Sequence, residues 1–220
     1  TMLPGTVARP KRAISGVSHM SPSHTVGQFF ESAVLTAGKD VQATYLLNCQ
    51  LKANGKLLVE GRKGVIIGGK TCAKLGVSCN GIGNIAEIAT VVSVGIDKED
   101  MTAYQELQKK IEQTQAELQT CENGLNKLMA NPVHDEKVSM MIQRLTRAVY
   151  TLKSSRKELF SERNAQMEQM TKQKEARIQV SGRAYPGTLL FLNEDPFAIK
   201  EIYNNVEFVK HDNRIDTLAH

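Results

Sequence analysis

Residues 64–71 have the sequence Gly64-Val-Ile-Ile-Gly-Gly-Lys-Thr71, and the conformation of this segment decides the fold. The segment matches the Walker A pattern, in which glycines, a lysine and a hydroxyl residue surround a phosphate. A phosphate-binding loop must curl around the anion and then open a helix. Here consecutive β-branched residues fill the middle of the motif, and such residues favour extended backbone. The segment is therefore predicted to be a strand.

The residues after the motif support the same prediction. Residues 72–83 contain three glycines and no amphipathic pattern with which a helix could begin at Thr71. A possible Walker B strand follows at 90–97, but its final aspartate also precedes a long helical pattern, where it would cap free N–H groups. Nucleotide binding is thus the alternative hypothesis. Its binding residues would be Gly64, Gly69, Lys70, Thr71 and Asp97.

Composition indicates an ordinary globular protein with a core of small aliphatic residues. Of the 220 residues, 41% are hydrophobic and 23% are charged, whereas only 5% are aromatic and none is tryptophan. No apolar run approaches the length of about 20 residues that a membrane span needs. The start of the chain does not resemble a signal peptide, so a cytoplasmic protein is expected. Because Thr1 precedes Met2, a piece of a longer protein is also expected.

The cysteines and histidines do not predict a metal site. Cys49, Cys72, Cys79 and Cys121 form no Cys-x-x-Cys pair and have no histidines at zinc-finger spacing. No set of catalytic side chains is recognisable either. We therefore expect a protein that is not an enzyme and that uses no cofactor and no metal.

The net charge of +5 raises the question of nucleic-acid binding. Residues 98–130 contain four basic and six acidic side chains, and residues 133–177 contain ten basic and six acidic ones. Two adjacent segments of opposite net charge can compensate each other. No stretch interleaves basic and aromatic residues as a single-strand binder would. A basic arm on nucleic acid is the third and weakest hypothesis, and no nucleic-acid partner is expected.

Short extended phrases punctuated by glycine repeat at residues 34–43, 51–59 and 64–69. Aligning Gly38 with Gly55 gives a period of 17 residues, close to one coil of a stacked β-solenoid. The expected fold is mainly a β-solenoid, a right-handed parallel β-helix with few coils, over residues 26–96. Residues 1–25 are expected to form an irregular lead. The competing interpretation is an antiparallel meander with glycine turns.

A heptad pattern begins at residue 97 and predicts an antiparallel coiled-coil hairpin over 97–177, with helices at about 98–130 and 135–175. At 1.5 Å per residue a helix of roughly 30 residues would be about 45 Å long. Ile111 opposite Arg156 is the one unfavourable pair of the predicted register. The predicted seam positions are Tyr104, Leu107, Ile111, Thr114, Leu118, Cys121, Leu125 and Leu128 in the first helix, and Val138, Ile142, Leu145, Val149, Leu152, Arg156, Leu159, Arg163, Gln166 and Met170 in the second.

After the hairpin the strand pattern returns. Residues 178–220 are expected to form return strands that pack on the β-helix, which makes the hairpin an insertion between two β parts. A turn is predicted at Tyr185-Pro-Gly187, and the strand patterns lie at Leu189–Leu192 and Val206–Val209.

These motifs together resemble the flagellar assembly protein A family, formerly a domain of unknown function. The resemblance covers residues 26–209, and Lys39 stands where the family commonly has a second glycine. It implies a scaffold in bacterial flagellar assembly or polar localisation, and a structural role for Lys70-Thr71. The residues that carry it are Phe29–Val34, Thr36–Val41, Lys63–Gly69, Ala73–Gly83, Val92–Gly95 and Tyr185–Gly187.

The first hypothesis is therefore a non-enzymatic protein-interaction scaffold. Its expected partners are other proteins, bound through the hairpin, and a second copy of the chain is one candidate. The solenoid rims are one expected binding surface, since exposed sheet edges need cover. The hairpin tip is the other, although a solvated turn is the simpler interpretation of it. The candidate partner-binding residues there are Met129, Pro132, Val133, His134 and Glu136.

Overall fold

The computed structural model describes residues 14–15, 18–61, 63–130, 135–212 and 214–219. The chain forms two compact units, a β unit and a helical unit that comprises Lys98–Gln169. The β unit contains the residues up to Asp97 and those from Met170 onward.

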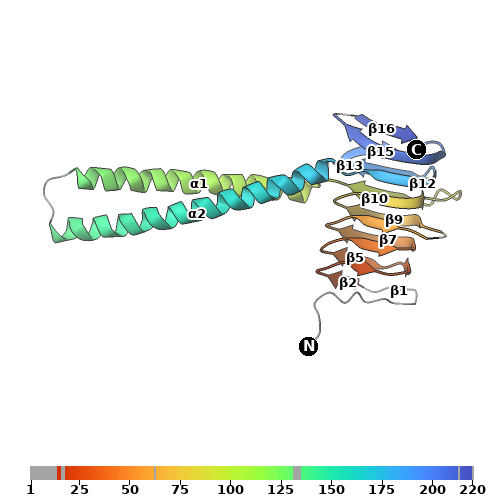
Figure 1. Ribbon diagram of the computed structural model, residues 1–220, viewed down its shortest axis with the longest axis horizontal. Helices are drawn as coiled ribbons and strands as arrows, with labels where there is room; N and C mark the ends of the chain where they lie inside the picture. Colours follow the sequence, from red (N-terminus) through yellow and green to blue (C-terminus); the bar gives the residue numbers. More distant parts are fainter. Residues whose placement is uncertain (1–13, 16–17, 62, 131–134, 213, 220) are drawn as a thin grey trace. The chain divides into compact units, whose positions relative to one another are not determined.

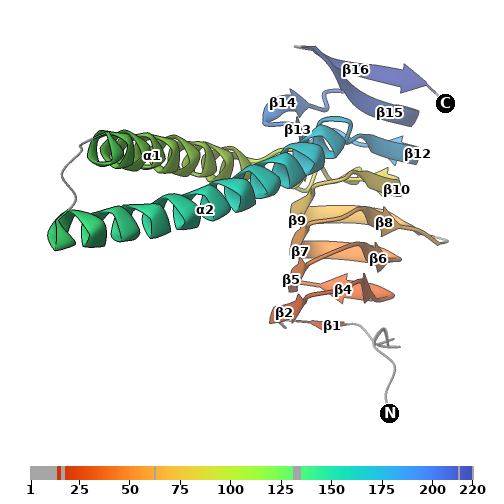
Figure 2. The same cartoon turned by 60° about the vertical axis from the view of Figure 1, so that its left-hand side comes forward.

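The β unit is a parallel solenoid whose strands pair from one coil to the next, as Figures 1 and 2 show. The registers define three stacks of strands. The first stack contains β1 (Ile14–Ser15), β4 (Phe29–Glu31) and the first halves of β7 (Tyr45–Ala53) and β9 (Val65–Ala73). The second contains β2 (Ser18–Ser21), β5 (Val34–Ala37), the second halves of β7 and β9, and β11 (Thr90–Val94). The third contains β3 (Thr25–Val26), β6 (Val41–Ala43), β8 (Leu57–Val59) and β10 (Val77–Ile82).

The parallel pairing confirms the solenoid and corrects its predicted period. Ala37 lies opposite Ala53, so the early coils repeat after 16 residues and not after 17. Ala53 lies opposite Ala73, so the next coil is longer, at 20 residues. The ladder aligns buried side chains, whereas the predicted period aligned the corner glycines. The antiparallel meander is wrong for these strands.

The core consists of columns of mainly aliphatic side chains that stack from coil to coil. Phe30, Leu46, Ile66 and Ile82 occupy successive positions of one column, and each is at most 1% exposed. Full burial of such a side chain contributes roughly 1.5–3 kcal/mol, so a few coils supply substantial stability. This arrangement explains how a chain poor in aromatic residues builds a core.

The return strands continue the solenoid before they close it. β12 (Ile178–Ala184) pairs in parallel with β10, and β13 (Thr188–Leu192) pairs in parallel with β11. The pairing then becomes antiparallel through β14 (Asp195–Ala198), β15 (Tyr203–His211) and β16 (Arg214–Ala219). An antiparallel hairpin stacked on the last coil covers an edge that would otherwise be open.

The lead predicted over residues 1–25 differs from the structure where the structure describes it. Ile14–Ser15 and Ser18–Ser21 are strands, and they pair in parallel with β4 and β5. These strands are too short to show an alternating pattern in the sequence. Their pairing comes from the neighbouring coil and not from their own residues.

The helical unit is an antiparallel pair formed by α1 (Lys98–Met129) and the greater part of α2 (Glu136–Lys174), with ends within a residue of those predicted. Asp135 caps α2, because its Oδ1 accepts a hydrogen bond from the Val138 N–H at 2.7 Å. Every predicted seam position is buried or half-buried. Leu118, at 1% exposed, is the most buried of them. The heptad prediction is confirmed, and the Arg156 guanidinium donates a hydrogen bond to Gln115 Oε1 at 2.9 Å.

The hairpin is inserted at one particular corner of the solenoid. In three earlier coils the corner between the second and third stacks is short, and it consists of residues 38–40, 54–56 and 74–76. At the next coil the same corner extends from residue 95 to residue 177, and it contains both helices. The strands on either side keep their parallel register across this insertion.

Asn193 fixes the two chain segments at this corner. Its side-chain oxygen accepts a hydrogen bond from the Ile96 N–H at 2.9 Å, and its side-chain NH₂ donates to the Lys174 carbonyl at 3.2 Å. Its own N–H donates to the Val94 carbonyl at 2.9 Å. One residue therefore binds the segment that leaves β11 and the end of α2.

Candidate functional site

The Walker-like segment is part of a strand and is not folded as a phosphate-binding loop. It lies in β9, which continues to Ala73, so no helix begins at Thr71. Lys70 is exposed, whereas Thr71 is 1% exposed and points to the opposite face. The Asp97 carboxylate lies 3.7 Å from the Lys52 Nζ. Lys70 and Thr71 therefore lie on opposite faces of β9 and do not face one phosphate.

The glycines of this segment have a structural role. The register places Gly68 at the corner that Ser32 and Asn48 occupy in the two preceding coils, and all three residues have positive φ. Gly69 also has a positive φ, and a Cβ on it would lie 2.2 Å from the Cys49 carbonyl oxygen. The match to the Walker A pattern thus arises from the backbone needs of a solenoid corner.

Two buried cysteines of the β unit, Cys49 and Cys79, have raised pKa values. Burial raises the pKa of the Cys79 thiol to about 12 and also raises the pKa of Cys49, so both thiols stay protonated and poorly nucleophilic. No group of acidic, histidine and cysteine side chains that could hold a metal occurs among the described residues. The described helices include none that is both long and apolar enough to cross a bilayer.

The predicted binding residues at the hairpin tip are only partly described. Met129 ends α1 with 62% of its surface exposed, and Glu136 begins α2 in an exposed position. Pro132, Val133 and His134 lie outside the described residues. A binding role for the tip stays a prediction.

The first half of α2 carries a concentration of positive charge. Residues 137–157 contain six basic side chains and no acidic one. Two of the six contact α1, since Lys153 pairs with Glu122 at 2.8 Å and Arg156 binds Gln115. Within the described part of the chain, the other four form no ion pair. They are Lys137, Arg144, Arg147 and Lys157.

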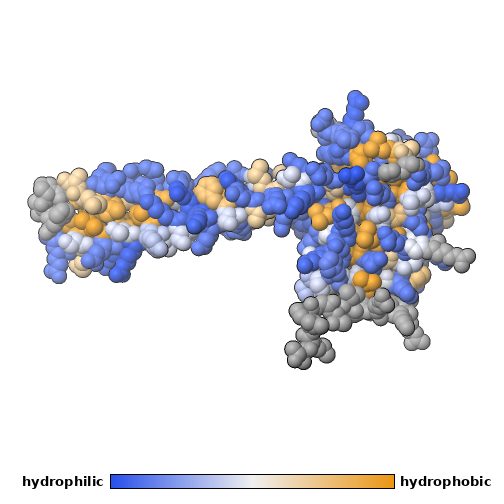
Figure 3. Space-filling view, viewed as in Figure 1, coloured by the Kyte–Doolittle hydropathy of each residue, from blue (hydrophilic) through white to orange (hydrophobic). Residues whose placement is uncertain are grey.

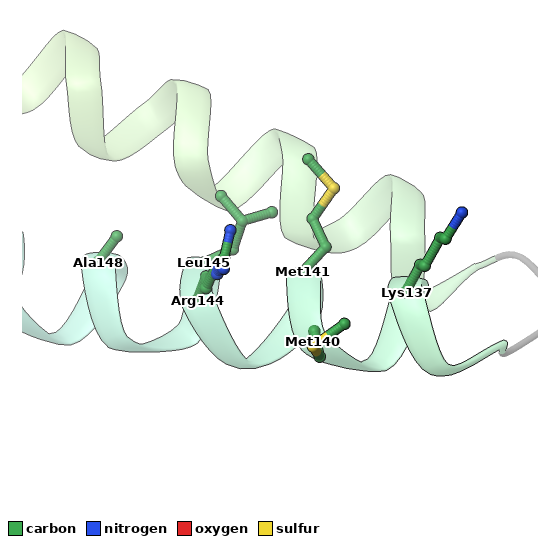
Figure 4. A pocket seen from close by; sticks show the side chains of 6 residues that line it. All are labelled: Lys137, Met140, Met141, Arg144, Leu145 and Ala148. Atoms are coloured by element: carbon green, nitrogen blue, oxygen red, sulfur yellow. The ribbon is translucent and has the colours of Figure 1, made fainter.

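A groove of about 430 Å³ lies on the same half of α2. Met140 and Met141 are 49% and 56% exposed, and Figure 4 shows Met141 and Leu145 pointing toward the side of α1. In Figure 3 apolar surface is concentrated in the half of the hairpin next to the grey residues. Gly124 of α1 faces Leu145, since a Cβ there would lie 3.6 Å from Leu145 Cδ1. The lining residues are Lys137, Met140, Met141, Arg144, Leu145 and Ala148.

The heptad pattern alone did not reveal this groove. Met140 and Met141 are not seam positions, and single exposed apolar residues are common on protein surfaces. The available signal was the exposed methionine doublet within a stretch of six basic and no acidic residues. It places a candidate interaction surface directly beside the predicted tip.

The fold and this surface define a parallel β-solenoid that carries a coiled-coil hairpin in one of its corners. Over residues 21–215 the chain matches the family model described as the flagellar assembly protein A beta solenoid domain, and it belongs to this family. The comparison with curated proteins and the comparison with solved structures give no match.

Proposed function

We propose that the chain is a non-enzymatic scaffold that binds other proteins in the cytoplasm during bacterial flagellar assembly or polar localisation. The family name links the chain to flagellar assembly. The solenoid supplies a rigid body of stacked coils, and the hairpin supplies exposed helical surface. The four free cysteines fit a reducing compartment.

One observation carries this proposal, which is the exposed surface on the first half of α2. The seam against α1 uses the apolar face of the hairpin, yet Met140 and Met141 are exposed beyond it. Lys137, Arg144 and Arg147 lie within seven residues of these methionines, and none of the three forms an ion pair among the described residues. An adaptable methionine surface with a charged border is typical of protein-binding sites.

Co-purification tests the proposal directly. The full chain, tagged and produced in a flagellated bacterium that encodes it, is expected to retain components of the flagellar machinery. A tagged unrelated coiled-coil protein serves as the control. Recovery of the same proteins with the control, or of no flagellar component with the chain, would contradict the proposal.

Nucleotide binding is tested with Lys70→Ala. Because Lys70 is an exposed residue within a strand, we expect no calorimetric binding of ATP or GTP by either form and an unchanged unfolding temperature. Binding by the natural chain that disappears in Lys70→Ala would support the nucleotide hypothesis instead.

A further inference from the structure

We infer that the groove on the first half of α2 binds an acidic amphipathic helix of a partner protein. This inference rests on the proposed function and specifies the chemistry of its partner. The groove is formed within the helical unit alone, because all its lining residues belong to residues 137–148 of α2.

The spacing of the lining residues suits a helix as the occupant. Lys137, Met141, Arg144 and Ala148 follow one another at intervals of four, three and four residues, which places them in a stripe along one face of α2. A second helix laid along such a stripe inserts its own side chains at the same intervals. Met140 and Met141 can adjust to these side chains because methionine is unbranched and flexible.

The basic residues of the groove specify the charge of the occupant. Lys137 and Arg144 are seven residues apart, about 10.5 Å along the helix axis. Neither forms an ion pair among the described residues, and α2 has no acidic side chain from 137 to 157. A partner helix with carboxylates two turns apart and apolar residues between them would complement both the two basic residues and the methionines of the groove.

The α1 helix of a second copy of this chain fits the groove less well. Apart from its seam, which packs against α2, the large hydrophobic residues exposed on α1 are Met101 and Met129, near opposite ends of that helix. Its exposed acidic residues therefore lack the apolar stripe that the groove requires. The other faces of α1 offer charge without a matching apolar surface.

Lipid and nucleic acid also fit less well. A helix that lies on a membrane uses bulky apolar side chains that stand out from its surface, whereas these residues line a recess. Phosphate groups of a nucleic acid would use the basic side chains but would leave the methionines without a role.

The experiment titrates the full chain into a fluorescent peptide of about three heptads, with leucine at the seam and glutamate at the flanking positions. Fluorescence anisotropy measures binding, and a peptide with lysine in place of glutamate is the charge control. Met141→Glu and Arg144→Glu alter the groove. Met101→Glu and Lys157→Glu make the same chemical changes at exposed positions elsewhere, and circular dichroism checks that all four variants stay helical.

We expect the glutamate peptide to bind and its affinity to fall with added salt. Each groove variant should weaken binding by about tenfold or more, and each control variant should change it by less than about twofold. The inference is overturned if the glutamate peptide does not bind, if the lysine peptide binds as tightly, or if the control variants weaken binding equally.

Three further measurements assign the surface to another occupant if the peptide result is negative. They are cosedimentation with vesicles of anionic phospholipid, binding of duplex DNA, and sedimentation of the chain alone. If the peptide does not bind and Arg144→Glu changes one of these three measurements, the inference is overturned. The occupant of the groove is then a membrane, a nucleic acid or a second copy, according to which measurement changes.

The same variants separate this inference from the proposed function. If flagellar proteins co-purify equally with the natural chain and with both groove variants, the scaffold proposal stands and the groove is not its binding site. If the peptide binds specifically but no flagellar component co-purifies, the groove chemistry stands and the proposed function fails.

Discussion

Gly68 and Gly69 have φ values of +69° and +77°, in the left-handed region that side chains with a Cβ rarely adopt. At Gly69 the position of a Cβ is also blocked by the backbone of the preceding coil, 2.2 Å away at the Cys49 carbonyl oxygen. Gly69 is thus required at this corner by two independent constraints, one conformational and one steric.

We predict that Gly69→Ala destabilises the solenoid by about 2–4 kcal/mol, because backbone strain and the clash with the neighbouring coil act together. Urea unfolding followed by the β signal in circular dichroism measures the change. Lys70→Ala, at the exposed neighbouring position, is the matched control. If the free energy of unfolding falls by less than about 0.5 kcal/mol, the neighbouring coil moves aside easily to make room for the Cβ.

Cys79 makes stability depend on pH at the alkaline end. The thiol has an ordinary pKa of 9.0 in the unfolded chain, and burial raises the pKa to about 12 in the folded one. Between these values the folded chain holds a proton that the unfolded chain has released, so stability falls as pH rises above about 9.

The predicted measurement compares the natural chain with Cys79→Ala in urea unfolding at pH 8 and pH 10. The variant lacks this titration, so the stability of the natural chain should fall relative to the variant by about 1 kcal/mol for each pH unit above 9. A constant difference between the two proteins over this range would refute the role of Cys79.

At the scale of elements, the heptad pattern predicts every seam position of the hairpin. One residue inside α1 nevertheless lowers the stability of that helix. Gly124 lies inside α1, where glycine costs about 1 kcal/mol relative to alanine. A Cβ there meets only Leu145 Cδ1, at an ordinary contact distance of 3.6 Å.

Gly124→Ala should therefore stabilise the hairpin by up to about 1 kcal/mol, which thermal unfolding followed by the helical signal can detect. Ala116→Gly, at an exposed position of the same helix, should produce the opposite shift. If Gly124→Ala lowers the unfolding temperature, the space beside Leu145 is smaller than the structure indicates.

The corner residue Asn193 offers a second prediction for an element. Asn193→Gly keeps access to positive φ but removes hydrogen bonds to Ile96 and Lys174, and it should cost about 1–2 kcal/mol. Asn193→Ala should cost more, because alanine also resists φ near +50°. Equal unfolding midpoints for the natural chain and both variants would show that the hydrogen bonds of Asn193 do not stabilise this corner.

Sequence predicted the elements to different degrees, for physical reasons. The helices were predictable because packing on one partner imposes a seam at every third or fourth residue, from Tyr104 to Met170. The coil length was not, because glycines mark corners whereas register follows buried residues such as Ala37 and Ala53. The groove was missed because its methionines lie outside the seam and the stripe that Met141 shares with Lys137 and Arg144 is partly charged.

At the scale of the whole molecule, the order of solenoid, hairpin and return strands was also predictable. The abrupt change of period at residue 97, and its reversal near residue 178, mark the insertion. The sequence did not show that β12 and β13 would continue the parallel stacks, because parallel and antiparallel strands share one alternating pattern.

We predict that the solenoid folds without its insertion. In a shortened chain, residues 95–177 are replaced by a copy of Lys74-Leu75-Gly76, the corner of an earlier coil. Because the flanking strands keep their register, this chain should show a β spectrum and cooperative unfolding. An unfolded or aggregated product would mean that the helices are needed for the solenoid to fold.

The corner between β11 and β12 also bears on how such proteins diversify. A change in the gene at this one corner can add, shorten or replace the whole helical hairpin. The parallel pairing of the strands continues undisturbed on both sides of it. The short corners at 38–40, 54–56 and 74–76 lie in the same column. They are natural grafting points for reporter tags or foreign modules.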